Sequence, residues 1–170
     1  MRRETIKSAI QRQLIRSDFG RIRWNNFITL MFHKSIQLEQ AEDLIDRWDW
    51  KVNRAMVGPR FTKGKNRNRR QVFFGCCGKD TSGNLHTHLN VKIPTDWIQE
   101  RFEDCSRSSF RQLVDNGTVH FSKNDKGYFD GTDNQGTVNY TTKFGHLGTD
   151  ERGAIDTSSI VISRNIEIVL

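Results

Sequence analysis

The stretch Asn84-Leu85-His86-Thr87-His88-Leu89-Asn90-Val91-Lys92-Ile93 alternates core-type and polar side chains almost without a break. This period of two is typical of a β-strand that buries one face. The side chains predicted to face the core are Leu85, Thr87, Leu89, Val91 and Ile93. The opposite face would carry His86, His88, Asn90 and Lys92. We therefore predict that two imidazoles lie side by side on one face of this strand.

A second strand-like run, residues 71–79, precedes this stretch, and Thr81-Ser82-Gly83-Asn84 lies between the two. Gly83 can adopt the positive φ that a tight turn requires, so we predict a β-hairpin. An apolar run of strand length, residues 27–32, precedes the hairpin and is consistent with a strand buried on both faces. The fold is therefore expected to contain antiparallel strands.

The remaining periodicities predict helices and two more strands around this hairpin. Asp96 and Gln99 have the spacing of a capping box for a helix that buries Ile98, Phe102 and Cys105. Gly58-Pro59 should end the helix before it. The predicted helices cover residues 5–16, 36–56, 96 to about 114 and 137–144, the further strands cover 119–121 and 159–169, and loops cover 58–70 and 123–136. This order favours an α+β fold in which helices pack on an antiparallel central sheet.

The length and composition exclude several classes of protein. The 170 residues suffice for about one domain, and the formal net charge is +7. No window approaches 18 consecutive apolar residues, no signal sequence is recognisable, and there is no GxxxxGK[ST] nucleotide loop. Three cysteines, Cys76, Cys77 and Cys105, form neither a disulfide framework nor a CxxC zinc pattern. We therefore expect an intracellular protein without a membrane span.

Positive charge is concentrated in two stretches, residues 1–23 and residues 58–70. The second stretch, hereafter the basic segment, contains six basic side chains and no acidic one. Such concentration favours a polyanionic partner, although a solvated loop is the alternative interpretation. A membrane surface is less favoured, because Gly58, Pro59 and Gly64 oppose a helix. The candidate DNA-binding residues are Arg60, Lys63, Lys65, Arg67, Arg69 and Arg70.

A second chemical motif, Tyr140-Thr141-Thr142-Lys143, lies in the helix predicted over residues 137–144. On a helix, positions i and i+3 share a face, so Lys143 would lie beside Tyr140. A neighbouring ammonium favours the phenolate form and attracts a phosphate that the phenolate could attack. The alternative is a half-buried aromatic side chain beside a solvated lysine.

Together, and in this order, the motifs resemble those of the HUH endonucleases, most closely the rolling-circle replication initiator (Rep) branch. Residues 27–32 are similar to the first family motif, His86-Thr87-His88 to the second and Tyr140-x-x-Lys143 to the third. Thr87 replaces the usual apolar residue between the histidines. The resemblance implies an RRM- or palm-like HUH sandwich over residues 22–170, with residues 1–21 as a basic helical extension.

The resemblance also implies a mechanism. His86 and His88 would hold Mg²⁺ or Mn²⁺, Tyr140 would attack a scissile phosphate, and Lys143 would position that phosphate. The activity would be site-specific nicking and joining of single-stranded DNA through a 5′-phosphotyrosine, which initiates replication of a plasmid, phage or single-stranded DNA virus. The partners would be an origin strand or hairpin and a separate or appended helicase, in the host cytoplasm or nucleus. The alternatives are a non-catalytic nucleic-acid-binding module and a single-strand transposase.

The resemblance leaves a third metal ligand to be placed, often a carboxylate on the adjoining strand or a third histidine. With the hairpin turn at its central Ser-Gly pair, His88 would lie opposite Cys77. His86 would then lie opposite Lys79, so neither partner is a carboxylate. Asp80 would lie on the other face in that register, although a slip of one residue reverses every face. The other candidate ligands are His33, His120 and His146.

Overall fold

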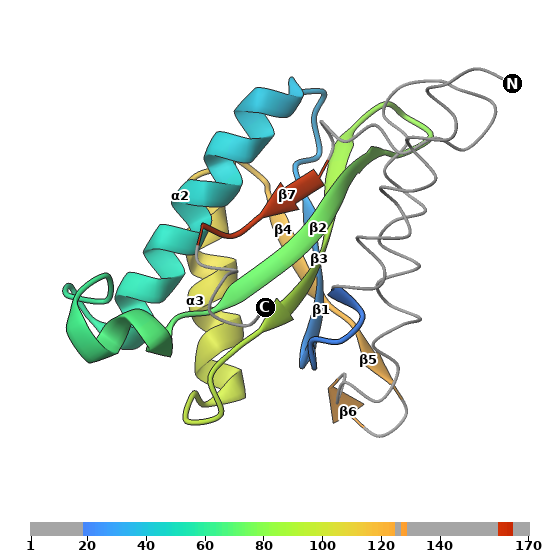
Figure 1. Ribbon diagram of the computed structural model, residues 1–170. Helices are drawn as coiled ribbons and strands as arrows, with labels where there is room; N and C mark the ends of the chain where they lie inside the picture. The colour runs from blue at the N-terminus through green and yellow to red at the C-terminus, as the bar shows by residue number, and fades with distance from the viewer. Residues whose placement is uncertain (1–18, 125–126, 129–159, 165–170) are drawn as a thin grey trace, which may run out of the picture.

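The computed structural model describes residues 19–124, 127–128 and 160–164. Within these ranges the chain forms an α+β fold, with a five-stranded sheet and two helices on one of its faces (Figure 1). The fold class predicted from the sequence is therefore confirmed at this level. The helices predicted over residues 5–16 and 137–144 lie outside the described residues, as does the end of the final strand.

The sheet has the strand order β4-β1-β3-β2-β7, and every neighbouring pair is antiparallel. The central strand is β3, which carries the two histidines. The strands are β1 (Asn26–Met31), β2 (Val72–Lys79), β3 (Leu85–Lys92), β4 (Thr118–Phe121) and β7 (Ile160–Ile162), and a separate small hairpin pairs β5 (Lys123–Asn124) with β6 (Gly127–Tyr128). That small hairpin occupies part of the segment predicted to be a loop.

The two helices cover the face of the sheet opposite the histidines. Helix α2 (Leu38–Val57) ends at Gly58, whose φ of 107° few other residues adopt. Helix α3 (Gln99–Arg111) packs beside it, and the Trp48 indole N–H donates to the Ser106 carbonyl oxygen over 3.2 Å. The core between helices and sheet includes all the hairpin side chains predicted to face inward except Thr87, which is itself buried.

The start of α3 differs from the capping-box prediction. The helix begins at Gln99 after Ile98, and no side chain caps it. Asp96 instead pairs with Arg69 over 2.6 Å, and the Gln99 amide donates to Asn26 Oδ1 over 2.7 Å. Ile98, predicted to be buried, is 62% exposed. Gln99 thus hydrogen-bonds to Asn26 on β1 and does not act as the second residue of a capping box.

The opposite face of the sheet is covered by the segment that precedes β1. Phe19 stacks on Phe74 with ring centroids 4.3 Å apart, and the Trp24 indole N–H donates to the Phe19 carbonyl oxygen over 2.8 Å. These side chains form a second apolar cluster with Val72 and Cys76 of β2. Both faces of β2 are therefore buried, as its continuous apolar sequence requires.

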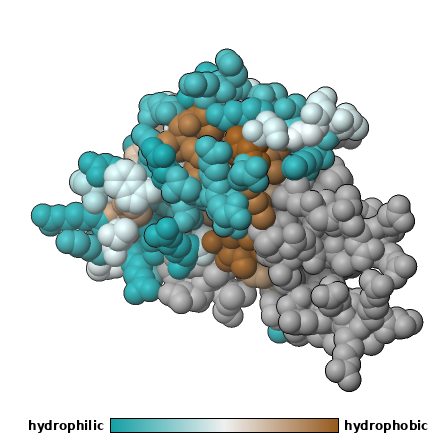
Figure 2. Space-filling view, turned by 90° about the horizontal axis from the view of Figure 1, so that it is seen from above, coloured by the Kyte–Doolittle hydropathy of each residue, from teal (hydrophilic) through white to brown (hydrophobic). Residues whose placement is uncertain are grey.

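One end of the molecule exposes part of the apolar core. Figure 2 shows hydrophobic residues gathered in the middle of this end, with hydrophilic residues around much of the group. Ile36 and Leu38, which lie at the start of α2, are only partly buried against the core. Among the described residues, no helix is both long enough and apolar enough to cross a membrane.

A cluster of polar side chains ties α2 to the start of β2. The Asn53 and Gln71 amides each donate to Asp49 Oδ1 over 2.9 Å, and Asn53 Oδ1 accepts from the Gln71 backbone N–H. Burial raises the pKa of Asp49 to about 7, against the opposing effects of the Gln71 hydrogen bond and the Arg70 charge. The cluster therefore holds a carboxyl group that loses its proton near neutral pH.

We expect the stability of the fold to fall as the pH rises from about 4 to 7, because of Asp49. The folded state keeps this proton up to about pH 7, whereas the unfolded chain releases it near pH 3.8. Asp49→Asn retains an oxygen that accepts both hydrogen bonds and should remove this pH dependence. Urea unfolding at pH 8 should show the variant more stable by about 4 kcal/mol, with no difference below pH 4.

Asp43→Asn is the matched control, because Asp43 lies on the same helix and its side chain is 68% exposed. Its stability should track the wild type within about 0.5 kcal/mol at every pH. An Asp49→Asn protein whose stability falls between pH 4 and 7 as steeply as the wild type would contradict this account of Asp49.

Candidate functional site

The β2–β3 register differs by one residue from the register predicted for the hairpin. His88 lies opposite Cys76 rather than Cys77, and His86 lies opposite Gly78 rather than Lys79. The reason is the loop, which has five residues between Lys79 and Leu85 instead of a two-residue turn. The predicted faces of β3 are correct, whereas the faces of β2 relative to β3 are reversed.

Asp80 creates the longer loop. Its carboxylate accepts hydrogen bonds from the backbone N–H groups of Ser82 and Asn84, both over 2.9 Å, and from the Asn84 amide over 3.2 Å. Gly83 adopts a φ of 80°. In this register Asp80 has the same parity as Gly78 and therefore lies on the histidine side, which is the one-residue slip that the sequence left open.

A close approach of the two strands at Gly75 also constrains the register. Gly75 is paired with Leu89, and a Cβ atom at Gly75 would collide with the backbone carbonyl oxygen of His88 and with the Leu89 side chain. Only glycine fits at this position without displacing the strand that carries the histidines.

The two histidines lie on the sheet face opposite the helices, as predicted. Their ring centroids are 4.8 Å apart and the ring planes meet at 72°. Two imidazoles whose nitrogens each lie about 2.1 Å from one ion have centroids roughly 5 Å apart. The observed separation of the rings therefore fits joint binding of a single cation.

The neighbouring strand β1 fixes the orientation of His88. Thr29 lies directly opposite His88, and its Oγ1 is 3.0 Å from Nδ1 of that ring. Phe27 stacks on the same imidazole, with ring centroids 5.7 Å apart and planes within 10°. With the proton on Nδ1, Nε2 is the nitrogen that can bind a cation. Thr29 belongs to the apolar run of residues 27–32, but its contact with His88 could not be predicted from that run because it depends on the β1–β3 register.

Both imidazoles are neutral at neutral pH. Burial, together with the charge of the nearby His86, lowers the pKa of His88 to about 4. Burial also lowers the pKa of His86, while the Asp80 charge acts in the opposite direction. Neutral imidazole is the form that coordinates a metal, so protons compete little with a cation for the pair at pH 7.

No third protein ligand completes the pair within the described part of the chain, where no three His, Cys, Asp or Glu side chains gather around one point. Cys76 lies opposite His88, but burial raises the pKa of its thiol to about 12, which disfavours the thiolate that metals bind. The Asp80 carboxylate is engaged in the hairpin loop. The described residues thus supply two nitrogen ligands, those of His86 and His88.

Two of the other histidine candidates, His33 and His120, lie apart from this pair. His120 shares the histidine face, opposite Thr29, but the intervening strand β1 puts its Cα about 10 Å from that of His88. His33 is exposed, with Nε2 2.9 Å from Thr118 Oγ1. His146 lies outside the described residues, as do Tyr140 and Lys143. The structure therefore neither tests the predicted nucleophile nor places it relative to the histidines.

The basic segment lies at the other end of β2 from the hairpin loop. It contains a 3₁₀ helix, Gly64–Arg69, where the sequence predicted a loop. It leads into β2 at Val72, six positions from Gly78, which corresponds to about 20 Å of extended chain. Of its six basic side chains, those of Arg60, Lys63, Lys65, Arg67 and Arg69 belong to exposed residues, whereas Arg70 is partly buried. The structure thus does not bring the predicted DNA-binding residues next to the histidine pair.

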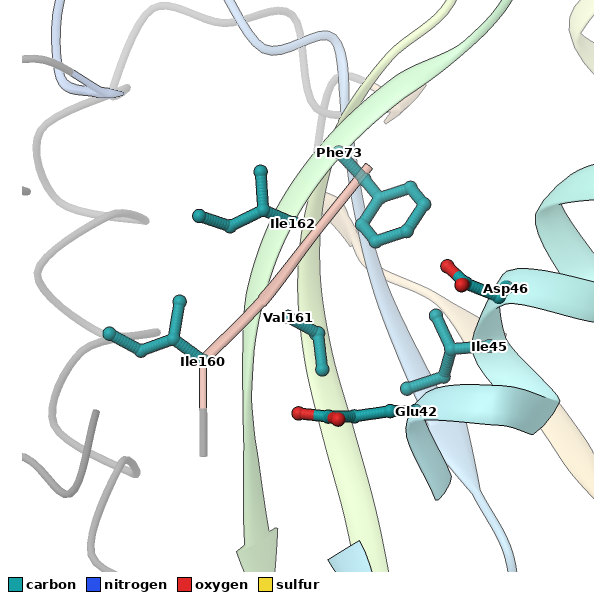
Figure 3. Close-up of a pocket in the computed structure, with 7 residues that line it drawn as sticks. All are labelled: Glu42, Ile45, Asp46, Phe73, Ile160, Val161 and Ile162. Carbon is teal, nitrogen blue, oxygen red and sulfur yellow. The ribbon is translucent and has the colours of Figure 1, made fainter. Parts of the chain in front are cut away.

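A pocket beside the edge strand β7 is a less suitable site for an anionic substrate. Figure 3 shows Glu42 and Asp46 of α2 at this pocket, with Val161 and Phe73 near them and Ile160 and Ile162 directed away from the helix. Asp46 accepts from the Arg164 guanidinium over 2.6 Å. Burial, together with the charges of Glu39 and Asp46, raises the pKa of Glu42. This acidic rim would repel phosphate groups.

The two adjacent cysteines are unreactive by environment. Cys76 and Cys77 are fully buried on opposite faces of β2, and burial raises the pKa of Cys77 to about 11. Cys77 Sγ lies 3.1 Å from Thr87 Oγ1, which places this polar pair within the helix-side core.

Comparisons with family models, with curated proteins and with solved structures found no match to this chain. The histidine pair, its contact with Thr29 and the surrounding sheet are therefore the observations on which a functional assignment depends.

We expect Thr29→Val to weaken Mn²⁺ binding about tenfold, because the variant loses the hydroxyl that orients His88. Thr29→Ser keeps the hydroxyl and should bind within about threefold of the wild type. Thr118→Val is the matched control, since that hydroxyl contacts His33 instead. Isothermal titration calorimetry at pH 7 measures all four proteins. Wild-type affinity in Thr29→Val would show that this hydrogen bond does not support cation binding.

Proposed function

We propose that this protein nicks and rejoins single-stranded DNA, with a divalent cation held by His86 and His88 and with Tyr140 as the nucleophile. The observation that carries the proposal is the pair of neutral imidazoles, 4.8 Å apart on the central strand of the sheet. Support also comes from the co-occurrence of this pair with a downstream Tyr-x-x-Lys motif, as in the HUH endonucleases that the sequence resembles.

The proposal also includes a more specific fold, the RRM- or palm-like HUH sandwich. A five-stranded antiparallel sheet with two helices on one face is compatible with an RRM- or palm-like HUH sandwich. In such an arrangement the face without these helices is available for the substrate strand. The histidines lie on that face, and in the described part of the chain Phe19 and Trp24 pack on it over β2.

Mg²⁺ or Mn²⁺ bound by the two imidazoles would polarise the scissile phosphate. Tyr140 Oη would attack phosphorus and form a phosphotyrosine bond to the 5′ side of the break. The bond between phosphorus and the 3′ oxygen would break, and that oxygen would leave as a 3′-hydroxyl after it takes up a proton. Lys143 would hold the phosphate and favour the phenolate form of Tyr140.

The covalent link conserves the energy of the broken phosphodiester bond. Attack of a 3′-hydroxyl on the phosphotyrosine would restore the DNA strand and release Tyr140, without ATP. Such chemistry suits the initiation of rolling-circle replication of a plasmid, phage or single-stranded DNA virus. A helicase, separate or appended, would supply strand separation, and the protein would act in the host cytoplasm or nucleus.

The test is covalent capture of DNA on the wild type and on two tyrosine variants. The chain has two tyrosines, so Tyr128→Phe is a matched control for Tyr140→Phe. A labelled pool of single-stranded DNA is incubated with Mn²⁺, and adducts are resolved on denaturing gels. We expect adducts with the wild type and with Tyr128→Phe, at least a hundredfold fewer with Tyr140→Phe, and none in EDTA.

Two results would decide against the proposal. An adduct formed by Tyr140→Phe would exclude Tyr140 as the nucleophile. The absence of any adduct, with DNA binding that is insensitive to EDTA, would favour a non-catalytic nucleic-acid-binding module instead. The paired variant His86→Ala/His88→Ala should abolish the adduct while leaving the circular dichroism spectrum unchanged, because both side chains lie outside the helix-side core.

A further inference from the structure

A groove runs along the seam between α2 and α3, on the layer of the molecule away from the histidines (Figure 1). It is open to solvent and combines aromatic, basic and hydroxyl side chains. Its lining residues on α2 are Trp50, Lys51, Arg54 and Ala55, and those on α3 are Asp104, Cys105, Ser108, Ser109 and Gln112. None of them takes part in the proposed nicking site.

Trp50 is the principal aromatic side chain of this groove. It is 47% exposed, whereas Trp24, Trp48 and Trp97 are at most 9% exposed. Its ring is held from two directions, by the Arg54 guanidinium carbon 5.1 Å from the ring centroid and by the edge-on Phe61 ring 5.9 Å away. An indole that is both exposed and oriented is suited to stack against a planar ligand.

The charges around Trp50 favour an anionic ligand. Lys51 and Arg54 line the groove, and Arg101 lies beside it, with its guanidinium donating to the Ala55 carbonyl oxygen over 3.2 Å. Asp104 is the acidic residue of the lining. Phe61, which contacts Trp50, belongs to the basic segment, so that segment adjoins the groove at Trp50.

We propose that this α2–α3 groove binds single-stranded nucleic acid, with a base stacked on Trp50 and phosphates held by Lys51, Arg54 and the basic segment. A planar aromatic platform flanked by cations suits a nucleobase next to a phosphate. An acidic peptide would use the charges but not the exposed indole. The exposed hydroxyl of Ser108 adds a hydrogen-bonding group for a sugar or phosphate oxygen.

Binding of nucleic acid in this groove does not depend on the nicking chemistry. The sheet separates the groove from the histidine pair, since the helices pack on one face and the imidazoles lie on the other. A strand bound in the groove would be held by one layer of the protein while another part of it reached the opposite face. The groove would therefore increase the affinity for the strand without contacting the phosphate at which the strand is cut.

Binding is tested in EDTA, where metal-dependent cleavage cannot contribute. The probe is a fluorescein-labelled oligothymidylate of about 20 nucleotides, followed by fluorescence anisotropy. We expect Trp50→Ala to weaken binding at least tenfold and Trp50→Phe to stay within about threefold of the wild type. Arg54→Ala should weaken binding and lower the slope of log K against log salt by about 0.7.

Ile98→Ala is the control, because Ile98 is an exposed apolar residue that does not line the groove. It should bind as the wild type does. Thermal unfolding of each variant separates a loss of binding from a loss of fold. Binding by a folded Trp50→Ala protein within twofold of the wild type would overturn the proposal.

Cys105 provides an independent measure of where the oligonucleotide binds. It lines the groove and is partly exposed, whereas Cys76 and Cys77 are buried, so alkylation by a maleimide reports on the groove. We expect saturating oligothymidylate to slow this reaction at least fivefold. An unchanged rate would overturn the proposal, as would stronger protection by polyglutamate, which would identify an acidic protein as the ligand. Neither result would bear on the Tyr140 adduct.

Discussion

The five-residue loop between Lys79 and Leu85 determines which side chains of β2 and β3 share a face. Side chains alternate strictly along a strand, so a loop shorter by one residue would exchange the two faces of β2 relative to β3. The Asp80 carboxylate holds the loop through two backbone N–H groups, and a Cβ atom at Gly75 would collide with the His88 carbonyl oxygen on the facing strand. Because β7 joins the sheet through β2, and β1 and β4 join it through β3, this pairing sets how the two halves of the sheet face each other.

Most of the fold follows from local periodicity in the sequence. The alternation across residues 84–93 correctly identifies the buried face of β3, and Gly58 marks the end of α2. Such patterns are reliable because a single face of a helix or strand must bury its apolar side chains against the core. The same argument places both histidines on the opposite face without any knowledge of their neighbours.

The features that the sequence did not predict depend on contacts between distant segments. The capping box at Asp96 and Gln99 fails because Arg69 and Asn26 bind these two side chains in the folded protein. The predicted hairpin register is wrong by one residue, because the Asp80 side chain stabilises a five-residue loop where a two-residue turn was expected. The hydrogen bond between Thr29 and His88, like the meeting of Trp50 with Phe61, joins elements whose relative position no local pattern encodes.

The edge strand β7 has a consequence for the order of folding. The β2–β3 hairpin joins residues close in sequence and can form within microseconds, whereas Phe74 meets Ile162 only after a long loop has closed. The outer edge of β2 therefore stays open during the early stages, with the apolar sequence Val72-Phe73-Phe74 available to other chains. The concentration of the chain and the supply of chaperones would then affect the yield of folded protein.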